Sequence, residues 1–228
     1  MDSKGVSLQR PTDIIYGGTF DPPHAGHRLV VERVIQLFPE AQVRVLPAAV
    51  PAGAYGQHKT PRANFEHRLA MCGLLLGDCA LIDPIEASLS RPNYTVRTVE
   101  ALDQRHPHRR WAMVLGRDQL ESFAAWYLPD RLIEKVSLLV IERDAQGGFE
   151  NELDQLALKL GRKLEAVNAV SWRWEGLETG IFSLGQSVSP AASRLIRADL
   201  ERASEDGWLA NDVYTYIKRH RLYTERGA

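Results

Sequence analysis

Short apolar runs alternate along this chain with longer segments in which apolar residues recur at helical spacing. The first run, residues 14–16, ends at a glycine pair, and residues 25–38 then place apolar side chains three and four positions apart. The alternation predicts strands at 14–16, 43–46, 80–82, 111–115, 136–141 and 180–184, and helices at 25–38, 63–76, 95–105, 150–164, 190–202 and 211–219. Strands that alternate with helices form βαβ units with right-handed crossovers, so the pattern predicts a parallel sheet.

The whole pattern indicates the α/β fold class, with a Rossmann-like open parallel sheet, helices on both faces and a small C-terminal helical part. We expect one domain over residues 1–228, with an α/β core at about 13–185 and the helical part at about 186–223. Residues 144–176 are less regular and include Trp172-Arg173-Trp174. We interpret them as a surface excursion that precedes the last strand.

The composition is that of an ordinary globular protein, since 44% of the 228 residues are hydrophobic and 25% are charged. A formal net charge of −1 predicts no general attraction to nucleic acid or to an anionic membrane. No apolar run approaches the roughly 20 residues that cross a bilayer, and residues 1–10 lack the apolar core of a signal peptide. Cys72 and Cys79 provide neither a C-x-x-C pair nor enough ligands for a metal site, so we expect a reducing, cytoplasmic location.

The junction between the first strand and the first helix carries the clearest chemistry. Gly17-Gly18 lies at the carboxyl end of the strand, where an open parallel sheet binds ligands. Glycine amides approach a phosphate closely, and the positive end of the next helix points to the same place. His24 and His27 are three residues apart, so they face the same way on the first helical turn. Together these residues predict a polyphosphate clamp, although neither G-x-G-x-x-G nor a Walker A loop is present.

Each part of this junction also has an ordinary interpretation. A Gly-Gly turn alone reverses the chain in many proteins, and two histidines at helical spacing often cap a helix or lie at the surface. The eleven-residue string from Gly17 to His27, placed directly after a strand, favours the phosphate site.

That string, G-G-T-F-D-P-P-H-A-G-H, resembles the signature of the nucleotidyltransferase superfamily with the H-x-G-H motif, and in particular that of the nicotinate-mononucleotide adenylyltransferases. Further segments are similar to that family, in the expected order over residues 13–223: His67-Arg68-Leu69-Ala70-Met71, Pro92-Asn93-Tyr94-Thr95, Gly116-Arg117-Asp118 with Phe123 and Trp126-Tyr127, Val140-Ile141-Glu142-Arg143, and Tyr216-Ile217 with Leu222-Tyr223. The resemblance implies an enzyme that moves the adenylyl group of ATP to nicotinate mononucleotide. Because no carboxylate cage is visible, we expect Mg²⁺ to be carried by the ATP phosphates and no metal ligands in the protein.

On the ATP side, the resemblance implies that His24, His27 and Arg197 act in catalysis. It also implies ATP contacts from Gly17, Gly18, Thr19, Phe20, Ser193 and Arg194. The ordinary alternative for the two arginines is a solvated helix face.

The chain departs from the family most clearly at residues 188–197, where the family pattern is Ile/Val-Ser-Ser/Ala-Thr-x-Ile-Arg. Alignment on Ile196-Arg197 places Ser193 in register and puts Arg194 where the family has Thr. Alignment on Val188-Ser189 instead requires three extra residues. Because Ser189-Pro190 is typical of a helix start, we expect a second helix N-terminus there that points at the triphosphate.

On the mononucleotide side, the resemblance implies contacts from Lys59, Thr95, Asp118, Trp126 and Tyr127. An indole stacks on a flat, cationic pyridine ring, and a carboxylate just past a strand end commonly binds ribose hydroxyls. Other roles stay open: Trp126 as a core residue, Asp118 and Thr95 as helix N-caps, and Lys59 as a solvated loop residue.

Two other functions stay open. One is a nucleotidyltransferase of the same superfamily that acts on phosphopantetheine or glycerol phosphate, which the Trp126-Tyr127 pair and the chain length disfavour. The other is a non-catalytic nucleotide-binding module, which the altered segment at 189–197 favours. The sequence favours neither the acid nor the amide form of the mononucleotide, and it predicts no particular oligomeric state.

Overall fold

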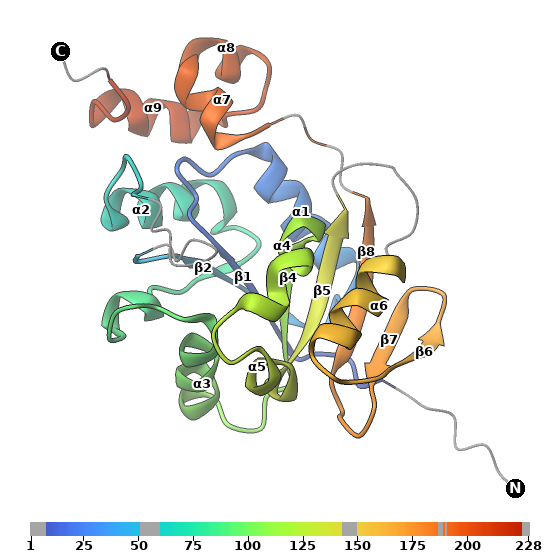
Figure 1. Cartoon of the computed structure of the whole chain (residues 1–228). Coiled ribbons are helices and arrows are strands. Elements are labelled where there is room, and N and C mark those ends of the chain that lie inside the picture. Colours follow the sequence, from blue (N-terminus) through green and yellow to red (C-terminus); the bar gives the residue numbers. More distant parts are fainter. Residues whose placement is uncertain (1–7, 51–59, 143–149, 187–188, 190, 225–228) are drawn as a thin grey trace, which may run out of the picture.

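The computed structural model describes residues 8–50, 60–142, 150–186, 189 and 191–224 (Figure 1). A central twisted sheet is covered by helices on both faces, and a group of short helices lies over one end of it. In this part of the chain, no helix is long and apolar enough to cross a membrane. The α/β fold class expected from the sequence is confirmed.

The sheet has eight strands in the order β3-β2-β1-β4-β5-β8-β7-β6. The strands are β1 Asp13–Gly18, β2 Gln42–Pro47, β3 Leu81–Ile82, β4 Trp111–Gly116, β5 Val136–Glu142, β6 Leu164–Asn168, β7 Ser171–Trp174 and β8 Gly180–Gln186. The strands from β3 to β8 in that order are parallel, whereas β7 and β6 are antiparallel. The order reverses direction between β1 and β4, because β1 pairs with both β2 and β4.

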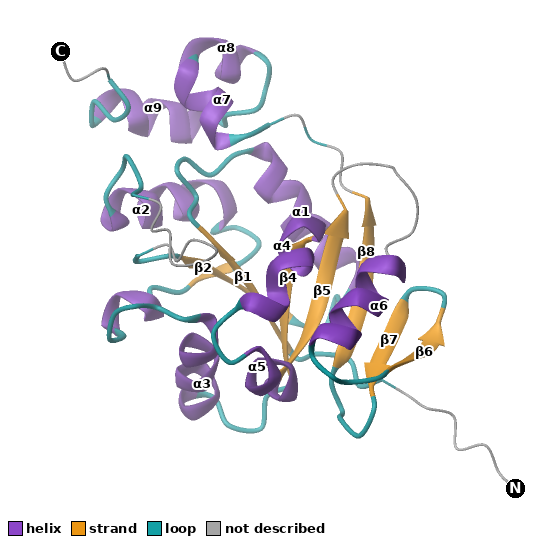
Figure 2. Cartoon of the chain, in the orientation of Figure 1, coloured by secondary structure: helices purple, strands orange, loops and turns teal. Residues whose placement is uncertain are grey.

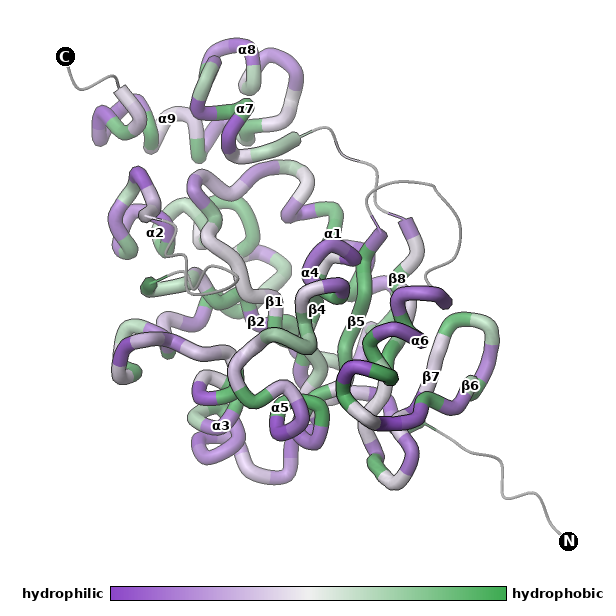
Figure 3. The backbone as a smooth tube through the Cα atoms, in the orientation of Figure 1, coloured by the Kyte–Doolittle hydropathy of each residue, from purple (hydrophilic) through white to green (hydrophobic). Residues whose placement is uncertain are grey.

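Helices cover both faces of this sheet (Figure 2). They are α1 Ala25–Leu37, α2 Phe65–Leu76, α3 Thr95–Arg105, α4 Arg117–Ser122, α5 Pro129–Lys135, α6 Glu150–Lys159, α7 Ser193–Ala198, α8 Leu200–Glu205 and α9 Asn211–Arg219, with 3₁₀ turns η2 Ile85–Ser88 and η3 Phe123–Ala125. Successive residues of a strand face opposite sides, so Ile14 packs with α1 and α2 while Ile15 packs with α3, α4 and α5. Both faces of β5 are buried, which gives that strand the continuous apolar stretch visible in Figure 3.

The interpretation of residues 144–176 as a surface excursion was wrong. After α6, this segment forms the β6–β7 hairpin, which extends the sheet beyond β8. Trp172 and Trp174 both pack against the core, and Trp174 is fully buried. Arg173 faces the other side, where its guanidinium donates to Glu165 at 3.0 Å. Trp172-Arg173-Trp174 therefore shows the alternation of buried and outward-facing side chains that is typical of a strand.

Two expected helices also end or begin at other residues. The helix expected at 150–164 ends at Lys159, because Gly161 adopts a φ of +60° and stops the turn. The helix expected at 190–202 is two short helices, α7 and α8, that meet at Asp199. The Asp199 side chain accepts from the backbone N–H of Arg202 at 3.0 Å and so caps α8.

The C-terminal helices share their apolar contacts with the core of the sheet. Ile196, Ala203, Val213 and Ile217 belong to the same buried cluster as Val31 of α1. The C-terminal helices therefore pack on the same core as the sheet.

Replacement of Ile217 by Ala tests that organisation. Ile217 is fully buried, so Ile217→Ala should lower the free energy of unfolding by about 2–5 kcal/mol, because the truncated side chain leaves a cavity. Urea unfolding followed by circular dichroism measures the change.

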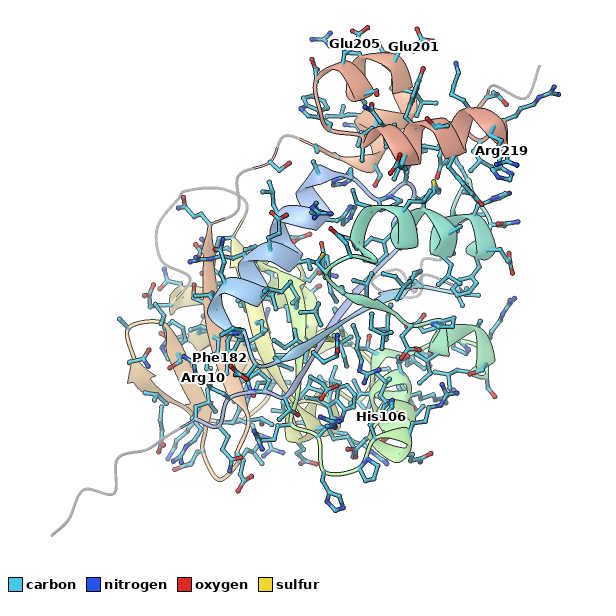
Figure 4. All side chains as sticks on the ribbon, turned by 180° about the vertical axis from the view of Figure 1, so that it is seen from behind. Arg10, His106, Phe182, Glu201, Glu205 and Arg219 are labelled. Atoms are coloured by element: carbon cyan, nitrogen blue, oxygen red, sulfur yellow. The ribbon has the colours of Figure 1, made fainter. Side chains whose placement is uncertain are left out.

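The control is Arg219→Ala, whose side chain is exposed at the outer end of the same helix (Figure 4). It should change the free energy of unfolding by less than about 0.5 kcal/mol. A separate early transition in Ile217→Ala, with the main transition unchanged, would show that the C-terminal helices unfold on their own.

Candidate active site

The predicted site lies where the strand order reverses, between β1 and β4. Gly17-Gly18 forms the carboxyl end of β1, and Gly116 forms the carboxyl end of the neighbouring β4. In open parallel sheets, ligands bind in the crevice at this switch point. The two most informative motifs of the sequence are therefore brought to the same edge of the sheet.

Phe20 shapes the turn that leaves β1. It adopts a left-handed φ of 51° while its side chain is 2% exposed. A Cβ atom on Gly18 would come within 2.9 Å of the Phe20 ring, so this position requires glycine. The ring also packs against Tyr16 and against His27, with centroids 5.5 and 4.9 Å apart. By contrast, Gly17 is exposed, which leaves its backbone open to a ligand.

His24 and His27 meet at the start of α1, as expected. His24 precedes the helix as its N-cap, and the two imidazole centroids are 3.7 Å apart. The backbone N–H of His24 donates to Nδ1 of His27 at 3.1 Å. Because Nδ1 accepts this bond, the ring proton of neutral His27 belongs on Nε2, which makes Nε2 a hydrogen-bond donor.

Gly26 keeps the space beside these rings open. A Cβ atom there would lie 3.1 Å from the His24 ring and 3.1 Å from Oγ of Ser189. The glycine of H-x-G-H therefore allows the segment around Ser189 to approach the histidines.

The carboxylate of Asp21 joins three distant segments to this turn. Asp21 is 5% exposed, and its oxygens accept from the backbone N–H groups of Arg62 at 2.8 Å and Ala63 at 3.1 Å. The hydroxyl of Tyr223, near the C-terminus, donates to it at 2.7 Å. Nη1 of Arg197 donates to the backbone carbonyl of Asp21 and lies 3.7 Å from its carboxylate. Burial raises the pKa of Tyr223, and the negative charge of Asp21 raises it further, so this hydroxyl remains a donor.

Arg68 supports the same turn from α2. Its guanidinium is almost fully buried and donates to three backbone carbonyls, those of Thr19 at 2.7 Å, Ala48 at 2.7 Å and Ala63 at 3.2 Å. Burial lowers the pKa of Arg68, and the nearby Asp21 carboxylate opposes this shift. The sequence matched Arg68 to a family motif but assigned roles neither to it nor to Asp21 and Tyr223.

The altered segment reaches the turn through α7. The expected helix start at Ser189-Pro190 was wrong: α7 begins at Ser193 after the N-cap residue Ala192, and Pro190 lies outside the described residues. Oγ of Ser189 instead accepts from the backbone N–H of Ala191 at 3.3 Å. Ser193 donates to the carbonyl of Pro22 at 2.9 Å, which places α7 against the H-x-G-H turn.

The two arginines of α7 are not equivalent. Arg197 is directed at the Asp21 turn, whereas Arg194 is exposed. A pocket of about 550 Å³ lies beside Arg197 and is also lined by Arg62, Lys218 and Tyr223.

Asp118 and Trp126, two of the residues expected on the mononucleotide side, lie in the segments that follow β4. Asp118 is the second residue of α4 and is exposed, while Trp126 is partly buried and packs on Phe123 with centroids 5.1 Å apart. Thr95 begins α3. The residue before it, Tyr94, stacks face to face on Tyr127, with centroids 4.2 Å apart and an angle of 22° between the rings.

The structure gives no contacts for Lys59 and no metal ligands among the described residues. Lys59 lies outside the described residues. Within the described ranges, no three His, Cys, Asp or Glu side chains form a group that could hold a metal ion.

Comparisons with known proteins identify the class. The model of a family described as cytidylyltransferase-like matches residues 15–184. The chain belongs to this family. A relative from Acidithiobacillus ferrooxidans named "Probable nicotinate-nucleotide adenylyltransferase" is 36% identical, over 92% of this chain and 94% of its own length. Within the family, the chain thus falls among the nicotinate-nucleotide adenylyltransferases, and the resemblance found in the sequence is confirmed.

Other matches are shorter or show the fold alone. A relative of the same name from Rubrobacter xylanophilus is 31% identical over 57% of this chain, which spans 60% of the relative's length. A solved structure of the Plasmodium falciparum nicotinic acid mononucleotide adenylyltransferase, complexed with NaAD, superimposes with a TM-score of 0.69. That match covers 94% of this chain and 98% of the other at 16% identity, and it shows that the fold is shared.

Replacement of Tyr223 by Phe tests the contact with Asp21. Tyr223→Phe keeps the ring but removes a donor to a buried carboxylate, so the free energy of unfolding should fall by about 1–3 kcal/mol. Denaturant unfolding measures the change.

Tyr214→Phe on α9 is the matched control, because the Tyr214 ring is also partly buried in the same cluster. It should have a much smaller effect. Equal losses in the two variants would mean that the bond to Asp21 contributes nothing specific.

Proposed function

We propose that this protein transfers the adenylyl group of ATP to nicotinate mononucleotide, giving deamido-NAD and pyrophosphate, as a step of NAD biosynthesis. The observation that carries the proposal is the H-x-G-H turn at the switch point of the sheet, with Arg197 bonded to the same turn. The full-length relative named for this activity supports the choice of acceptor. We propose a single-domain enzyme, and its cytoplasmic location stays a prediction.

The reaction is an in-line displacement at phosphorus. An oxygen of the 5′-phosphate of the mononucleotide attacks the α-phosphorus of ATP, a new P–O–P bond forms, and the bond to the β-phosphate breaks to release pyrophosphate. A phosphate monoester is already anionic near neutral pH, so the nucleophile needs little help from a base. Catalysis therefore rests on alignment and on stabilisation of the charge that moves to the leaving group.

The histidines and the backbone of the first turn would hold the reacting phosphates. In the proposed complex, Nε2–H of His27 donates to an oxygen of the α-phosphate or to the bridging oxygen, and His24 binds beside it. The fixed tautomer of His27 supports this role, because the donor is oriented before ATP arrives. The backbone from Gly17 to Phe20 would position the triphosphate.

Positive charge would come from the C-terminal segment. The bond of Arg197 to the Asp21 turn supports a contact with the phosphates, and Ser193 on the same helix would contribute a hydroxyl. Arg194 and Lys59 stay proposed ATP and mononucleotide contacts. Mg²⁺, bound to the phosphates of ATP as part of the substrate, would neutralise charge on the departing pyrophosphate.

The pyridine ring would bind at the end of β4. Partial burial of Trp126 suits both earlier interpretations, since one part of the indole packs on the core and the remainder is available for stacking. Thr95 and the backbone amides near Trp126 and Tyr127 would hold the pyridine substituent. Asp118 would accept from a ribose hydroxyl.

The alternative of a non-catalytic module has lost its main support. It depended on the altered segment at 189–197, yet that segment brings Ser193 and Arg197 to the turn that precedes α1. Pyrophosphate release with ATP and nicotinate mononucleotide tests the proposal. Phosphopantetheine and glycerol phosphate, offered with ATP or CTP, test the other acceptors, and use of one of these instead of the mononucleotide would overturn it.

His27→Ala should lower kcat by about 10²-fold or more and change the KM for ATP much less, because the lost donor acts on charge that develops in the transition state. Steady-state kinetics with both substrates measure the split. A variant within threefold of the wild-type kcat would remove His27 from the mechanism.

Trp126→Ala should raise the KM for the mononucleotide and leave the KM for ATP nearly unchanged, because the indole would stack on the pyridine ring alone. The same kinetic measurements serve, with thermal unfolding as a check on folding. A defect confined to ATP would place Trp126 in the wrong half of the site.

A further inference from the structure

An arginine lies against the stacked tyrosines at the proposed pyridine site. Arg97 is the third residue of α3, three positions after Tyr94, so both face the same side of the helix start. Its guanidinium carbon lies 5.4 Å from the ring centroid of Tyr94 and 5.6 Å from that of Tyr127. These distances place the guanidinium beside the stacked pair, nearly equidistant from the two rings.

The three residues connect the two segments that would hold the pyridine substituent. Tyr94 directly precedes Thr95, and Tyr127 directly follows Trp126, so the stack brings these segments together although they are far apart in sequence. Any group bound between Thr95 and the backbone near Tyr127 is therefore close to the guanidinium of Arg97.

The charge of Arg97 has no counter-charge in the part of the chain that the structure describes. Neighbouring arginines are engaged elsewhere: Arg131 pairs with Glu100 at 2.5 Å, and Arg105 donates to Ser88 at 3.2 Å. Arg97 forms no ion pair with a described carboxylate, and its side chain is exposed beside Tyr127, which is 43% exposed. A cation in this state attracts an anionic ligand.

We propose that Arg97 selects the acid form of the mononucleotide over the amide form, by placing its guanidinium beside the pyridine carboxylate. This inference rests on the proposed function. A carboxylate and a carboxamide have nearly the same shape, so packing discriminates between them poorly. The acid carries a full negative charge that the amide lacks, and a planar guanidinium binds a carboxylate with two parallel hydrogen bonds.

The test is the ratio of kcat/KM for nicotinate mononucleotide to kcat/KM for nicotinamide mononucleotide, measured at saturating ATP. Arg97→Gln should lower this ratio about three- to tenfold, through a higher KM for the acid, which is the range expected for a partly exposed charged contact. Arg97→Lys keeps the charge and should retain most of the ratio. The preference of the wild-type protein should also weaken as salt is raised.

Arg105→Gln is the matched control. It removes a charge from the same helix at a side chain that contacts Ser88 instead of the tyrosines, so it should leave the ratio within about twofold. If Arg97→Gln lowers kcat/KM for the acid and for the amide by the same factor, Arg97 only supports the positions of Tyr94 and Tyr127, and the inference is wrong.

Calorimetric titration without ATP separates this inference from the proposed function. The wild type should bind nicotinate mononucleotide more tightly than the amide, and Arg97→Gln should reduce that difference. Acid-selective binding without any adenylyl transfer would contradict the function and support the role of Arg97. Equal kcat/KM values of the wild type for the two mononucleotides would agree with the proposed adenylyl transfer and overturn the role of Arg97.

Discussion

The buried carboxylate of Asp21 is the contact on which the geometry of the phosphate site depends. A charge removed from water is costly unless donors surround it, and here the donors come from residues 62–63, from Arg197 and from Tyr223. These partners lie between 41 and 202 residues away along the chain. Satisfying one carboxylate thus fixes the β1–α1 turn, the start of α2, α7 and the C-terminal tail relative to one another.

Arg68 completes this arrangement with the opposite charge. It binds only carbonyl oxygens among its described hydrogen-bond partners, and two of these, Thr19 and Ala48, follow the adjacent strands β1 and β2. A guanidinium has enough donors to bridge three segments at once, which a shorter cation cannot do. Arg68 therefore holds the turn from α2, and Arg197 and Tyr223 hold it from the C-terminal segment through Asp21.

The sequence predicted local features well and long-range contacts poorly. The expected bounds of α3 and α9 match the structure, because each helix carries a clear apolar face, and Pro107 follows the first of them. The β6–β7 hairpin was missed, since a four-residue strand with Arg173 between two tryptophans gives a weak periodic signal. Asp199 did offer a signal, as an N-cap residue inside the helix expected at 190–202.

The site residues divide in the same way. The H-x-G-H histidines and the glycine pair were found because their chemistry lies within eleven consecutive residues. The role of Tyr223 was not, because its partner is 202 residues away and only the folded chain brings them together. Arg68 was visible in the sequence as part of a family motif and as an arginine on an otherwise apolar helix face, yet the carbonyls that it binds have no sequence signature.

The two proposed halves of the site are held by different kinds of interaction. The difference suits the transfer step in one half and the binding of the acceptor in the other. The proposed phosphate half consists of backbone, buried charges and a histidine tautomer set by its hydrogen bond, which suits a step in which donors must be in place before charge develops. The acceptor half consists of partly exposed side chains, with Tyr94, Arg97 and Tyr127 held by stacking instead of by a buried hydrogen-bond network. In the proposed complex, a changed side chain there would alter which acceptor is bound and leave the contacts of Asp21 in place. Among the described residues, no hydrogen bond joins the stacked side chains to the Asp21 contacts, so the two proposed halves of the site are held by separate sets of interactions.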